Sequence, residues 1–378
     1  MIKIGIECES IEDGAWGVAR LINKLLEEIN RRPELQKEFK FYLYFKSKIP
    51  DYSYLKNPIF EKKIVKLPII PPSFSLYYYI YLPVLLWFKR VDVMFFPNYM
   101  LPLIFCGRSL VVLTDDIHYE SRNQKLPFRY RLAYRIFAGW AAVHASRIMA
   151  ISETSKRELS RLFGIKPQRI TVNHLGVDTY NVQSRDESRQ YILYVGQAFP
   201  RRHLRETILA FEKLVKEHSN ILENVGMSEL KLIAIGPDKY GTPVINSLVS
   251  KVNNRLGREA VIHKDYVKDE ELTNLYAGAK ALVYVSDREA FGLPPMEALS
   301  FGVPPVIADN ELGHELFKDY AFYVRNTDTD GIAEGIKNAL TQTDKIMKIK
   351  NEGPIFAKQY SWSKFTDRWL EIIRSLIK

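Results

Sequence analysis

Two glutamates, Glu289 and Glu297, flank a turn and the start of a predicted helix, and seven residues separate them. The apolar run that ends at Val285 is typical of a strand, and Pro294 suits the first turn of a helix that Gly302 can end. Free backbone N–H groups at such a helix start bind phosphate. The two carboxylates are placed to accept hydrogen bonds from hydroxyls on either side of a bound diphosphate. The spacing therefore predicts a ligand that carries a diphosphate between a sugar and a ribose.

Two glutamates at this spacing are, on their own, more often the solvated face of a helix. The segment between them is therefore what distinguishes a binding site from such a face. It reads Ala-Phe-Gly-Leu-Pro-Pro-Met, with a flexible glycine near the first glutamate and prolines where a helix starts. This segment resembles the E-x7-E motif of retaining glycosyltransferases with the GT-B fold, a large group that contains mannosyl- and glucosyltransferases.

The resemblance implies roles for individual residues of this segment. Glu289 would orient the donor sugar, and Glu297 would bind the ribose. Sugar hydroxyls or phosphate would be held by the backbone N–H groups of Phe291, Gly292 and Leu293. In this family, retention is usually described as attack on the front face, assisted by the leaving phosphate, with no obligatory protein nucleophile.

Two arginines follow another strand-like run, in the sequence Gly196-Gln-Ala-Phe-Pro-Arg201-Arg202-His203. Arginine suits a diphosphate because its planar fork donates two parallel hydrogen bonds while it stays charged. Fixed cations also stabilise a leaving diphosphate, which gains negative charge in the transition state. Alone, the pair reads as two surface arginines at a helix start. The resembling family has a pattern close to Pro-Arg-Lys-Asn here. The resemblance therefore assigns the diphosphate to Arg201 and Arg202, beside Gly196, although Arg202 stands where lysine is usual.

A glycine-rich loop near the N-terminus joins the first predicted strand to the first predicted helix. It spans Glu12–Arg20, and its glycines Gly14 and Gly17 let the backbone approach a ligand closely. A Gly-x-x-Gly loop alone is a weak signal, and the missing third glycine argues against a dinucleotide-binding fingerprint. The loop resembles the family's glycine-rich loop, which faces donor and acceptor, and the resemblance gives that role to Gly17.

The predicted strand Leu110–Leu113 is followed by Thr-Asp115-Asp116-Ile-His118. The resembling proteins usually have His-Asp here, with the histidine near the transferred sugar. In this chain Asp115 takes the histidine position and His118 is the nearest histidine, so both are candidates for contact with the sugar. Paired acids after a strand are more often capping or solvated groups than metal ligands. The family does not generally need a metal, because cations and helix dipoles balance the diphosphate. We therefore predict no metal and no cofactor.

Two further loops follow predicted strands in the second half and are candidates for recognition of the nucleobase. They are Gly236–Tyr240 and His263–Val267. The second resembles the family loop whose backbone reads the edge of the base, and it brings Tyr266 and Val267 to the predicted site. Backbone recognition leaves little trace in side chains, so the choice between UDP and GDP stays open.

Strand-like apolar runs alternate with helical patterns along the whole chain, which is typical of parallel α/β layers. The predicted strands of the first half are Ile2–Ile6, Phe39–Phe45, Val91–Phe96, Leu110–Leu113 and Ile148–Ile151. Those of the second half are Tyr191–Val195, Leu232–Ile235, Val261–His263, Leu282–Val285 and Pro305–Ala308. With the resemblance, this pattern predicts a GT-B fold, in which two Rossmann-like, doubly wound α/β domains face a cleft.

The polar stretch Asp178–Gln190 separates the two series of strands and is the predicted linker. We expect an N-terminal acceptor-binding domain at residues 1–178 and a C-terminal domain for the nucleotide sugar at 179–359. Residues 360–378 have the pattern of an amphipathic helix. The resemblance implies that this last helix packs back on the N-terminal domain.

Composition places the chain among ordinary globular proteins, with 378 residues, 47% hydrophobic and 26% charged. The two cysteines, Cys8 and Cys106, give no disulfide framework and suit a reducing compartment. The first residues read as a strand rather than a signal peptide. No stretch offers about 18 uninterrupted apolar residues, so we expect no transmembrane span and a cytoplasmic location.

Positive charge is concentrated in the first half of the chain. Residues 1–178 hold 27 Lys and Arg against 17 Asp and Glu, whereas residues 179–378 hold 27 of each. No nucleic-acid-binding module is present in the sequence, so another anionic partner is expected. Residues 69–105 are rich in aromatics, and arginines follow at 122, 129, 131 and 135. Such a region either packs in the core or docks on an anionic membrane, and the charge favours peripheral membrane contact.

Together these observations predict a retaining glycosyltransferase. It would move a hexose, mannose or glucose, from a GDP- or UDP-linked donor to a glycan or lipid-linked acceptor in surface polysaccharide synthesis. One alternative is a GT-B relative with other chemistry, such as an inverting epimerase or a sugar-phosphate phosphorylase. Another is a degenerate subunit that binds a partner enzyme, for which the departures at Asp115 and Arg202 are the best support.

Overall fold

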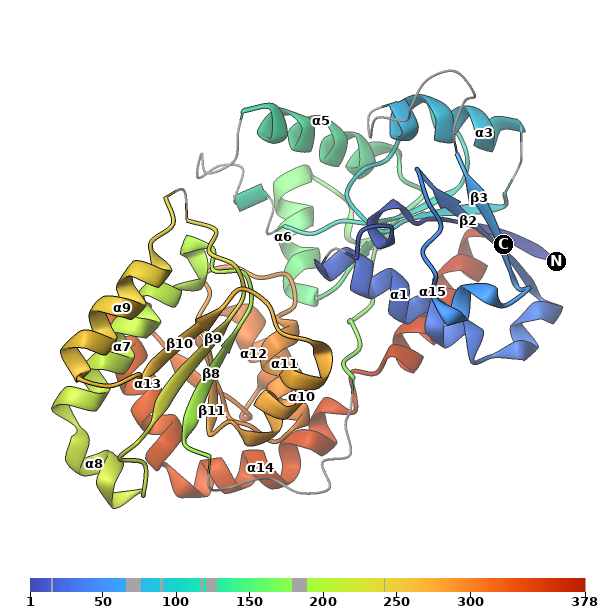
Figure 1. Ribbon diagram of the computed structural model, residues 1–378. Coiled ribbons are helices and arrows are strands. Elements are labelled where there is room, and N and C mark those ends of the chain that lie inside the picture. Colours follow the sequence, from blue (N-terminus) through green and yellow to red (C-terminus); the bar gives the residue numbers. More distant parts are fainter. Residues whose placement is uncertain are drawn as a thin grey trace. The chain divides into compact units, whose positions relative to one another are not determined.

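The chain forms two compact units, each with its own parallel sheet (Figure 1). The computed structural model describes residues 1–14, 16–65, 76–88, 91–115, 118–119, 128–178, 189–240 and 242–377, apart from the side chains of residues 16, 129 and 130. The N-terminal unit holds Met1–Gly176 and Trp362–Lys378, and the C-terminal unit holds Val177–Ser361. Most of the predicted linker, together with Asp116, Arg122 and the Arg129 side chain, lies outside the described residues.

The N-terminal unit is built on a seven-stranded sheet in the order β3-β2-β1-β4-β5-β6-β7. Its strands are β1 (Ile2–Glu7), β2 (Phe39–Phe45), β3 (Phe60–Ile64), β4 (Val93–Phe96), β5 (Ser109–Val112), β6 (Arg147–Ala150) and β7 (Ile170–Val172). All neighbours pair in parallel. The strand order reverses between β1 and β4, so the loops after these two strands flank a topological switch point.

Helices cover both faces of this sheet. They are α1 (Trp16–Asn30), α3 (Leu82–Phe88), α5 (Phe128–His144), α6 (Glu153–Phe163) and α15 (Trp362–Ile377), with the π-helical turn η4 (Tyr77–Tyr81) before α3. One face carries α1 and α15. On the other face, a single apolar core joins strand residues such as Phe96 to side chains of η4, α3, α5 and α6. The parallel sheet is therefore buried on both sides, as its apolar strands require.

The last helix, α15, belongs to the N-terminal unit although it ends the chain. Its Trp369 is fully buried and contacts the rings of Phe41 and Phe95, at centroid distances of 6.4 and 5.4 Å. On the same helix, Arg374 donates two hydrogen bonds to Glu38. An aromatic anchor with ion pairs at its rim thus fastens the end of the chain to the first sheet.

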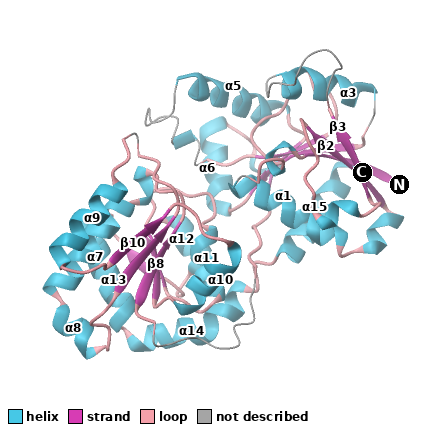
Figure 2. Cartoon of the chain, viewed as in Figure 1, coloured by secondary structure: helices cyan, strands magenta, loops and turns pink. Residues whose placement is uncertain are grey.

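The C-terminal unit has a six-stranded parallel sheet in the order β10-β9-β8-β11-β12-β13. Its strands are β8 (Tyr191–Val195), β9 (Lys231–Ile235), β10 (Val261–Lys264), β11 (Ala281–Tyr284), β12 (Pro305–Ala308) and β13 (Phe322–Val324). Here the order reverses between β8 and β11. In Figure 2 these strands form the second magenta sheet, with helices on both faces.

Helices of the C-terminal unit flank this sheet or its edges (Figure 1). They are α7 (Leu204–Glu217), α8 (Ser219–Asn224), α9 (Ile245–Leu256), α10 (Asp269–Gly278), α11 (Leu293–Ser300), α12 (Glu311–Phe317), α13 (Thr329–Thr341) and α14 (Thr343–Ala357). A core of Leu193, Leu282, Ala298 and Phe301 links β8 and β11 to α11 and the turn that follows it. This packing sets where α11 begins relative to the end of β11.

The prediction of two doubly wound parallel α/β domains is confirmed, and each predicted strand is present within two residues of its predicted bounds. The sequence reading missed β3, β7 and β13, which are all edge strands. Two of them are only three residues long, and β3 reads Phe-Glu-Lys-Lys-Ile. The two short strands are too short to show a pattern, and the charged centre of β3 interrupts its apolar run.

The aromatic residues at 77–96 divide between core and surface. Buried rings belong to Tyr77, Tyr78, Tyr81, Phe95 and Phe96, whereas Trp87 and Phe88 are exposed. Core packing therefore accounts for most of this aromatic segment but not for the end of α3. None of the helices among the described residues is both long and apolar enough to cross a membrane.

We expect Trp369→Ala to lower the free energy of unfolding of the N-terminal unit by about 3–5 kcal/mol, because it empties a fully buried indole site. Denaturant unfolding followed by circular dichroism measures this loss. The neighbouring Arg368→Ala is the matched control, since its side chain is 52% exposed and pairs only at the surface with Glu371. Its effect should stay within about 0.5 kcal/mol. An equal loss in both variants would contradict an anchor at Trp369.

Candidate functional site

The loops after β8 and β11 meet at the switch point of the C-terminal sheet. In an open parallel sheet, the crevice for a ligand lies outside the carboxyl ends of the strands where the order reverses. The β8 loop carries Gly196, Arg201 and Arg202, and the β11 loop carries Glu289. The topology therefore brings together residues that are almost ninety positions apart in the sequence.

Arg202 and Glu289 form a bidentate ion pair across this point. Arg202 Nε donates to Glu289 Oε1 at 2.6 Å, and Arg202 Nη2 donates to Oε2 at 3.0 Å. Both side chains are largely buried, with exposures of 15% and 14%. Burial raises the pKa of the Glu289 carboxyl, but the charge and hydrogen bonds of Arg202 outweigh this and hold the pKa below its ordinary value. Glu289 is therefore ionised at neutral pH.

Arg201 and Ser286 complete the surroundings of the Glu289 carboxylate. Arg201 Nη2 lies 3.8 Å from Glu289 Oε1, and Arg201 Nε donates to the carbonyl of Arg288 at 3.1 Å. Ser286 Oγ donates to Glu289 Oε1 at 3.0 Å. Two arginines from one loop thus converge on one carboxylate of the other, a contact that spacing in the sequence does not reveal.

A second set of contacts ties the same two loops. Asp287 donates its backbone N–H to the carbonyl of Arg201 at 2.9 Å, and the Asp287 carboxylate lies 2.6 Å from His203 Nε2. His203 has φ +47°, a left-handed conformation that few residues besides glycine and asparagine adopt readily. Burial alone would lower the pKa of His203, but Asp287 and Glu206 raise it from 6.5 to about 9. The imidazolium therefore pairs with Asp287 at neutral pH.

Glycines at the ends of β8 and β9 allow their loops to touch. A side chain at Gly236 would lie 2.1 Å from the Gly196 carbonyl oxygen, and both glycines have positive φ. Ala198 and Asp238 then form an isolated bridge between the loops. Asp238 in turn accepts hydrogen bonds from the backbone at the start of α9. The β8 loop is therefore held from both sides, by β9 and by β11.

Helix α11 begins directly after the β11 loop, as the sequence predicted. The helix begins at Leu293, one residue before the predicted proline, and has proline in its first turn. Gly292 before it has φ +87°, which favours glycine there. A small crevice of about 310 Å³, partly open to solvent, lies beside this terminus and is lined by residues that include Glu289, Gly292 and Asn310.

Glu297 lies inside α11 and is buried. Tyr276 of α10 donates its hydroxyl to Glu297 Oε2 at 2.8 Å, and its ring stacks on Phe301 at 5.6 Å. Sequence reasoning missed Tyr276, because an aromatic residue on a helix carries no local sign of its distant partner. In the β10 loop, Tyr266 is exposed and Val267 is buried. Their predicted role in binding the base stays a prediction.

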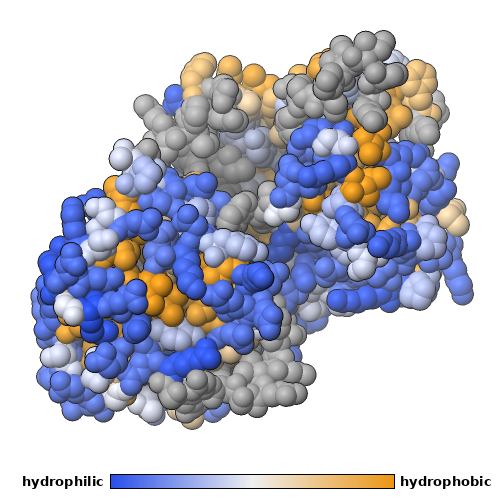
Figure 3. All heavy atoms as spheres, in the orientation of Figure 1, coloured by the Kyte–Doolittle hydropathy of each residue, from blue (hydrophilic) through white to orange (hydrophobic). Residues whose placement is uncertain are grey.

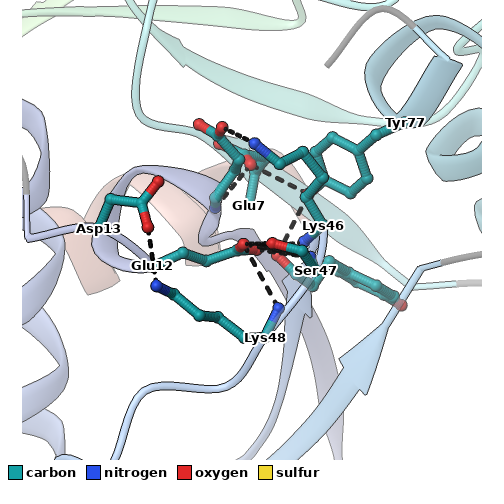
Figure 4. A network of polar contacts seen from close by, with 9 residues as sticks. Glu7, Glu12, Asp13, Lys46, Ser47, Lys48 and Tyr77 are labelled. Atoms are coloured by element: carbon teal, nitrogen blue, oxygen red, sulfur yellow. Dashed lines mark hydrogen bonds and ion pairs between the residues drawn. The ribbon is translucent and has the colours of Figure 1, made fainter. Parts of the chain in front are cut away.

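The glycine-rich loop of the N-terminal unit is stabilised by a polar network (Figure 4). Glu12 accepts hydrogen bonds from the Lys46 and Ser47 backbone N–H groups and from the Ser47 hydroxyl. Lys48 pairs with Asp13 at 2.8 Å. Gly14 has φ +69°, whereas Gly17 lies in the first turn of α1 rather than in the loop. The backbone around Gly17 is therefore that of a helix terminus.

A buried acid at the end of β1 was missed by sequence reasoning. Glu7 is fully enclosed at the switch point of the N-terminal sheet, and it accepts hydrogen bonds from the Glu9 backbone and from Tyr77 Oη at 2.8 and 3.0 Å. Burial raises the pKa of Glu7 to about 7. An apolar strand that ends in one acid is the signal that could have indicated it.

Asp115 and His118 lie after β5 in the N-terminal unit. Asp115 is buried, and its carbonyl accepts from the His118 backbone N–H at 3.0 Å. The His118 ring packs edge-on against Tyr134 and Phe163. Contact of Asp115 or His118 with the sugar stays a prediction. Among the described residues, no group of three or more potential ligands could hold a metal ion.

We expect the stability contribution of His203 to depend on pH. Because its pKa is raised from 6.5 to about 9, the contribution is complete below pH 6.5 and is lost as the pH rises through 9. His203→Asn keeps a residue suited to the left-handed backbone but removes the charge. Thermal melting at pH 6 and pH 10 measures this. At pH 6 the free energy of unfolding of wild type should exceed that of the variant by about 1–3 kcal/mol more than at pH 10, a range reduced because Asp287 is half-exposed. A difference that does not change with pH would contradict the ion pair.

Two sequence profiles of known protein families match the two halves of the chain. The sequence profile described as "Glycosyltransferase Family 4" matches residues 41–180, and the one described as "Glycosyl transferases group 1" matches residues 179–355. The chain is 25% identical over 278 residues to the O-antigen chain mannosyltransferase RfbU of Salmonella typhimurium, covering 72% of each protein. It is 30% identical over 246 residues to O-antigen chain mannosyltransferase B of Escherichia coli, covering 61% of each.

Solved structures with the same fold cover nearly the whole chain. WaaG, a glycosyltransferase involved in lipopolysaccharide biosynthesis, matches with a TM-score of 0.71 at 17% identity over 99% of both chains. HepE of Anabaena, solved with UDP-glucose, matches with a TM-score of 0.70 at 16% identity over 99% of this chain and 100% of its own. The two glycosyltransferase profiles adjoin along the sequence and together span residues 41–355, with the group 1 profile on the C-terminal part, so the chain is a glycosyltransferase with the predicted GT-B fold.

Proposed function

We propose that this protein is a retaining mannosyltransferase that uses a nucleoside diphosphate sugar. The observation that carries the proposal is the convergence of Arg201, Arg202 and Glu289 at the switch point of the C-terminal sheet, with Glu297 eight residues after Glu289 in the sequence. The names of the two O-antigen mannosyltransferases support mannose as the sugar. The acceptor would be a glycan or a lipid-linked glycan of a surface polysaccharide. Transfer would then take place at the inner face of the membrane.

Arg202 and Arg201 would bind the diphosphate while Arg202 keeps its hydrogen bonds to Glu289. Arg202 has five N–H donors. Among the described residues it uses three, two with Glu289 and one with the carbonyl of Gln197 at 3.3 Å. Two donors then remain for phosphate oxygens, and Arg201 lies beside them. As the bond to the sugar breaks, the diphosphate gains charge next to both cations, which lowers the barrier.

Glu289 would both position Arg202 and accept hydrogen bonds from the donor sugar. Its carboxylate has two oxygens with about four acceptor sites, and Arg202 and Ser286 occupy three of them. The backbone N–H groups of Phe291, Gly292 and Leu293 would add donors from the start of α11. Front-face attack by the acceptor hydroxyl would then use the leaving phosphate as base, so the product keeps the configuration of the donor.

The N-terminal unit would supply the acceptor side. Gly17, at the start of α1, and Asp115 or His118, after β5, are the residues proposed to face the acceptor or the transferred sugar. No observation favours the alternative of a degenerate subunit: both arginines contact Glu289 at the switch point, and Glu297 is held separately by Tyr276.

Nucleotide binding tests the donor site. Calorimetric titration with GDP and with UDP, without added metal, should show tight binding of one of them. Glu297→Gln should weaken it about tenfold or more, because a charged hydrogen bond to the ribose is lost. Tyr276→Phe, which removes only the hydroxyl that holds Glu297, should weaken it about three- to tenfold.

The matched control for the titration is Glu334→Gln on α13, whose side chain is exposed. It should bind like wild type. Failure of wild type to bind either nucleotide would remove the transferase proposal. Equal affinities in wild type and Glu297→Gln would remove Glu297 from the ribose site and leave the rest of the proposal standing.

Turnover tests the role of Glu289. Glu289→Ala removes the only carboxylate that faces buried Arg202 among the described residues, so it should destabilise the fold as well as activity. Glu289→Gln is the cleaner variant, since it keeps the shape and one hydrogen bond. We expect kcat for mannosyl transfer to fall about 10²–10³-fold, with a smaller loss of melting temperature than in Glu289→Ala. Proton NMR of the product reports its anomeric configuration, and an inverted product or full turnover in Glu289→Gln would contradict the mechanism.

A further inference from the structure

Helix α5 of the N-terminal unit has two apolar stripes. One is buried against the core and contains small residues and Tyr134. The other is exposed and runs along the helix at intervals of four, four and seven residues, through Phe128, Leu132, Ile136 and Val143. A surface helix normally has a polar face opposite its buried one. Packing in the core of this unit therefore does not explain why the second stripe is apolar.

The turn η4 and helix α3 carry a matching exposed stripe. It consists of Ile80, Val84, Trp87 and Phe88, at intervals of four, three and one residues. Trp87 is 78% exposed and Phe88 is 83% exposed, whereas Phe128 on α5 is 70% exposed. Single exposed apolar residues are common, but large aromatic residues gathered in stripes mark a binding surface.

The two stripes belong to one face of the N-terminal unit. Helices α3 and α5 cover the same side of the sheet, because both contribute to one buried core. Between them, Tyr79 stacks on Phe137 with ring centroids 4.6 Å apart. Apolar residues gather along the same upper edge in Figure 3, where α5 and α3 lie in Figure 1. We call the eight residues of the two stripes, Ile80, Val84, Trp87, Phe88, Phe128, Leu132, Ile136 and Val143, the α3–α5 face.

The charge around the α3–α5 face selects the kind of partner. Neither η4, α3 nor α5 contains an acidic residue, and α5 carries Arg131 and Arg135 beside its exposed stripe. The whole net charge of +10 belongs to residues 1–178. Apolar and aromatic side chains flanked by arginines fit the interface of an anionic bilayer, where rings enter the headgroup region and cations meet lipid phosphates. A second copy of this face would bring arginines against arginines.

We propose that the α3–α5 face docks the protein on an anionic membrane surface. The inference extends the proposed function, since it gives the surface on which a lipid-linked acceptor would be met. It stands on the exposed stripes and their charge, which are independent of the donor site.

Vesicle binding tests the inference. Sedimentation of the full chain with vesicles of phosphatidylcholine, alone or mixed equally with phosphatidylglycerol, measures the partition coefficient. Wild type should bind the mixed vesicles much more tightly than the neutral ones. The double variant Trp87→Ser, Phe128→Ser should bind the mixed vesicles at least about tenfold less. Arg131→Gln should lower the same binding about fivefold and reduce its dependence on salt.

Ile355→Ser is the matched control, because Ile355 is 68% exposed on α14 of the other unit. It should bind vesicles like wild type. Equal binding by wild type and the double variant, with circular dichroism and melting temperature unchanged, would overturn the inference. So would a wild type that ignores vesicles and forms a dimer that the double variant does not, since the α3–α5 face would then bind a second copy.

Nucleotide titration of the same samples separates this inference from the proposed function. The double variant should bind GDP or UDP as wild type does, because the substituted residues lie in the other unit from the donor site. Vesicle binding that fails while nucleotide binding is intact would reject the docking face alone. Vesicle binding through this face without nucleotide binding would reject the transferase proposal alone.

Discussion

The ion pair between Arg202 and Glu289 is the contact on which the candidate site depends. It joins the loop after β8 to the loop after β11, so it spans the point where the strand order of the C-terminal sheet reverses. The contacts around it have the same function, since His203 with Asp287 and the backbone of Arg201 tie the same two loops. Glycines at 196 and 236 bring the β9 loop against this pair of loops. A substitution of Arg202 or Glu289 would therefore disturb the positions of the loops after β8 and β11.

The energetics of such a pair indicate that stability alone does not account for it. Removing two charges from water costs about as much as their attraction returns, so a buried ion pair is weak support for a fold. In the proposed function, it would hold two cations in place before a diphosphate binds, so that little reorganisation would be needed during the reaction. Two departures from the family pattern fit this reading. Arginine at 202 reaches Glu289 with a fork that lysine lacks, and histidine at 203 adds a charge that pairs with Asp287. Both departures strengthen ties to the β11 loop.

The N-terminal unit exposes large apolar side chains beside positive charge. Its aromatic segment sends five rings into the core and leaves Trp87 and Phe88 outside, and α5 is apolar on both sides. Since this unit also carries the net positive charge of the chain, its surface combines the two properties that a phospholipid interface selects. Residues 179–378 hold equal numbers of acids and bases, and the proposed donor site lies in the C-terminal unit. The proposed donor site and the proposed membrane-docking face thus lie in separate units.

The sequence by itself determined the fold class and the positions of the central strands, because buried parallel strands require continuous apolar runs. It also placed Glu289 and the two arginines after strands and Glu297 inside a helix, since local turn residues and helix starts leave a signal within a few positions. Only the tertiary structure decided that Arg202 binds Glu289, that Tyr276 holds Glu297, and that His203 pairs with Asp287. It alone also separated the buried rings of the aromatic segment from the exposed ones. These contacts join residues 21 to 87 positions apart, and sequence periodicity carries no information about which side chains meet after the sheet has formed.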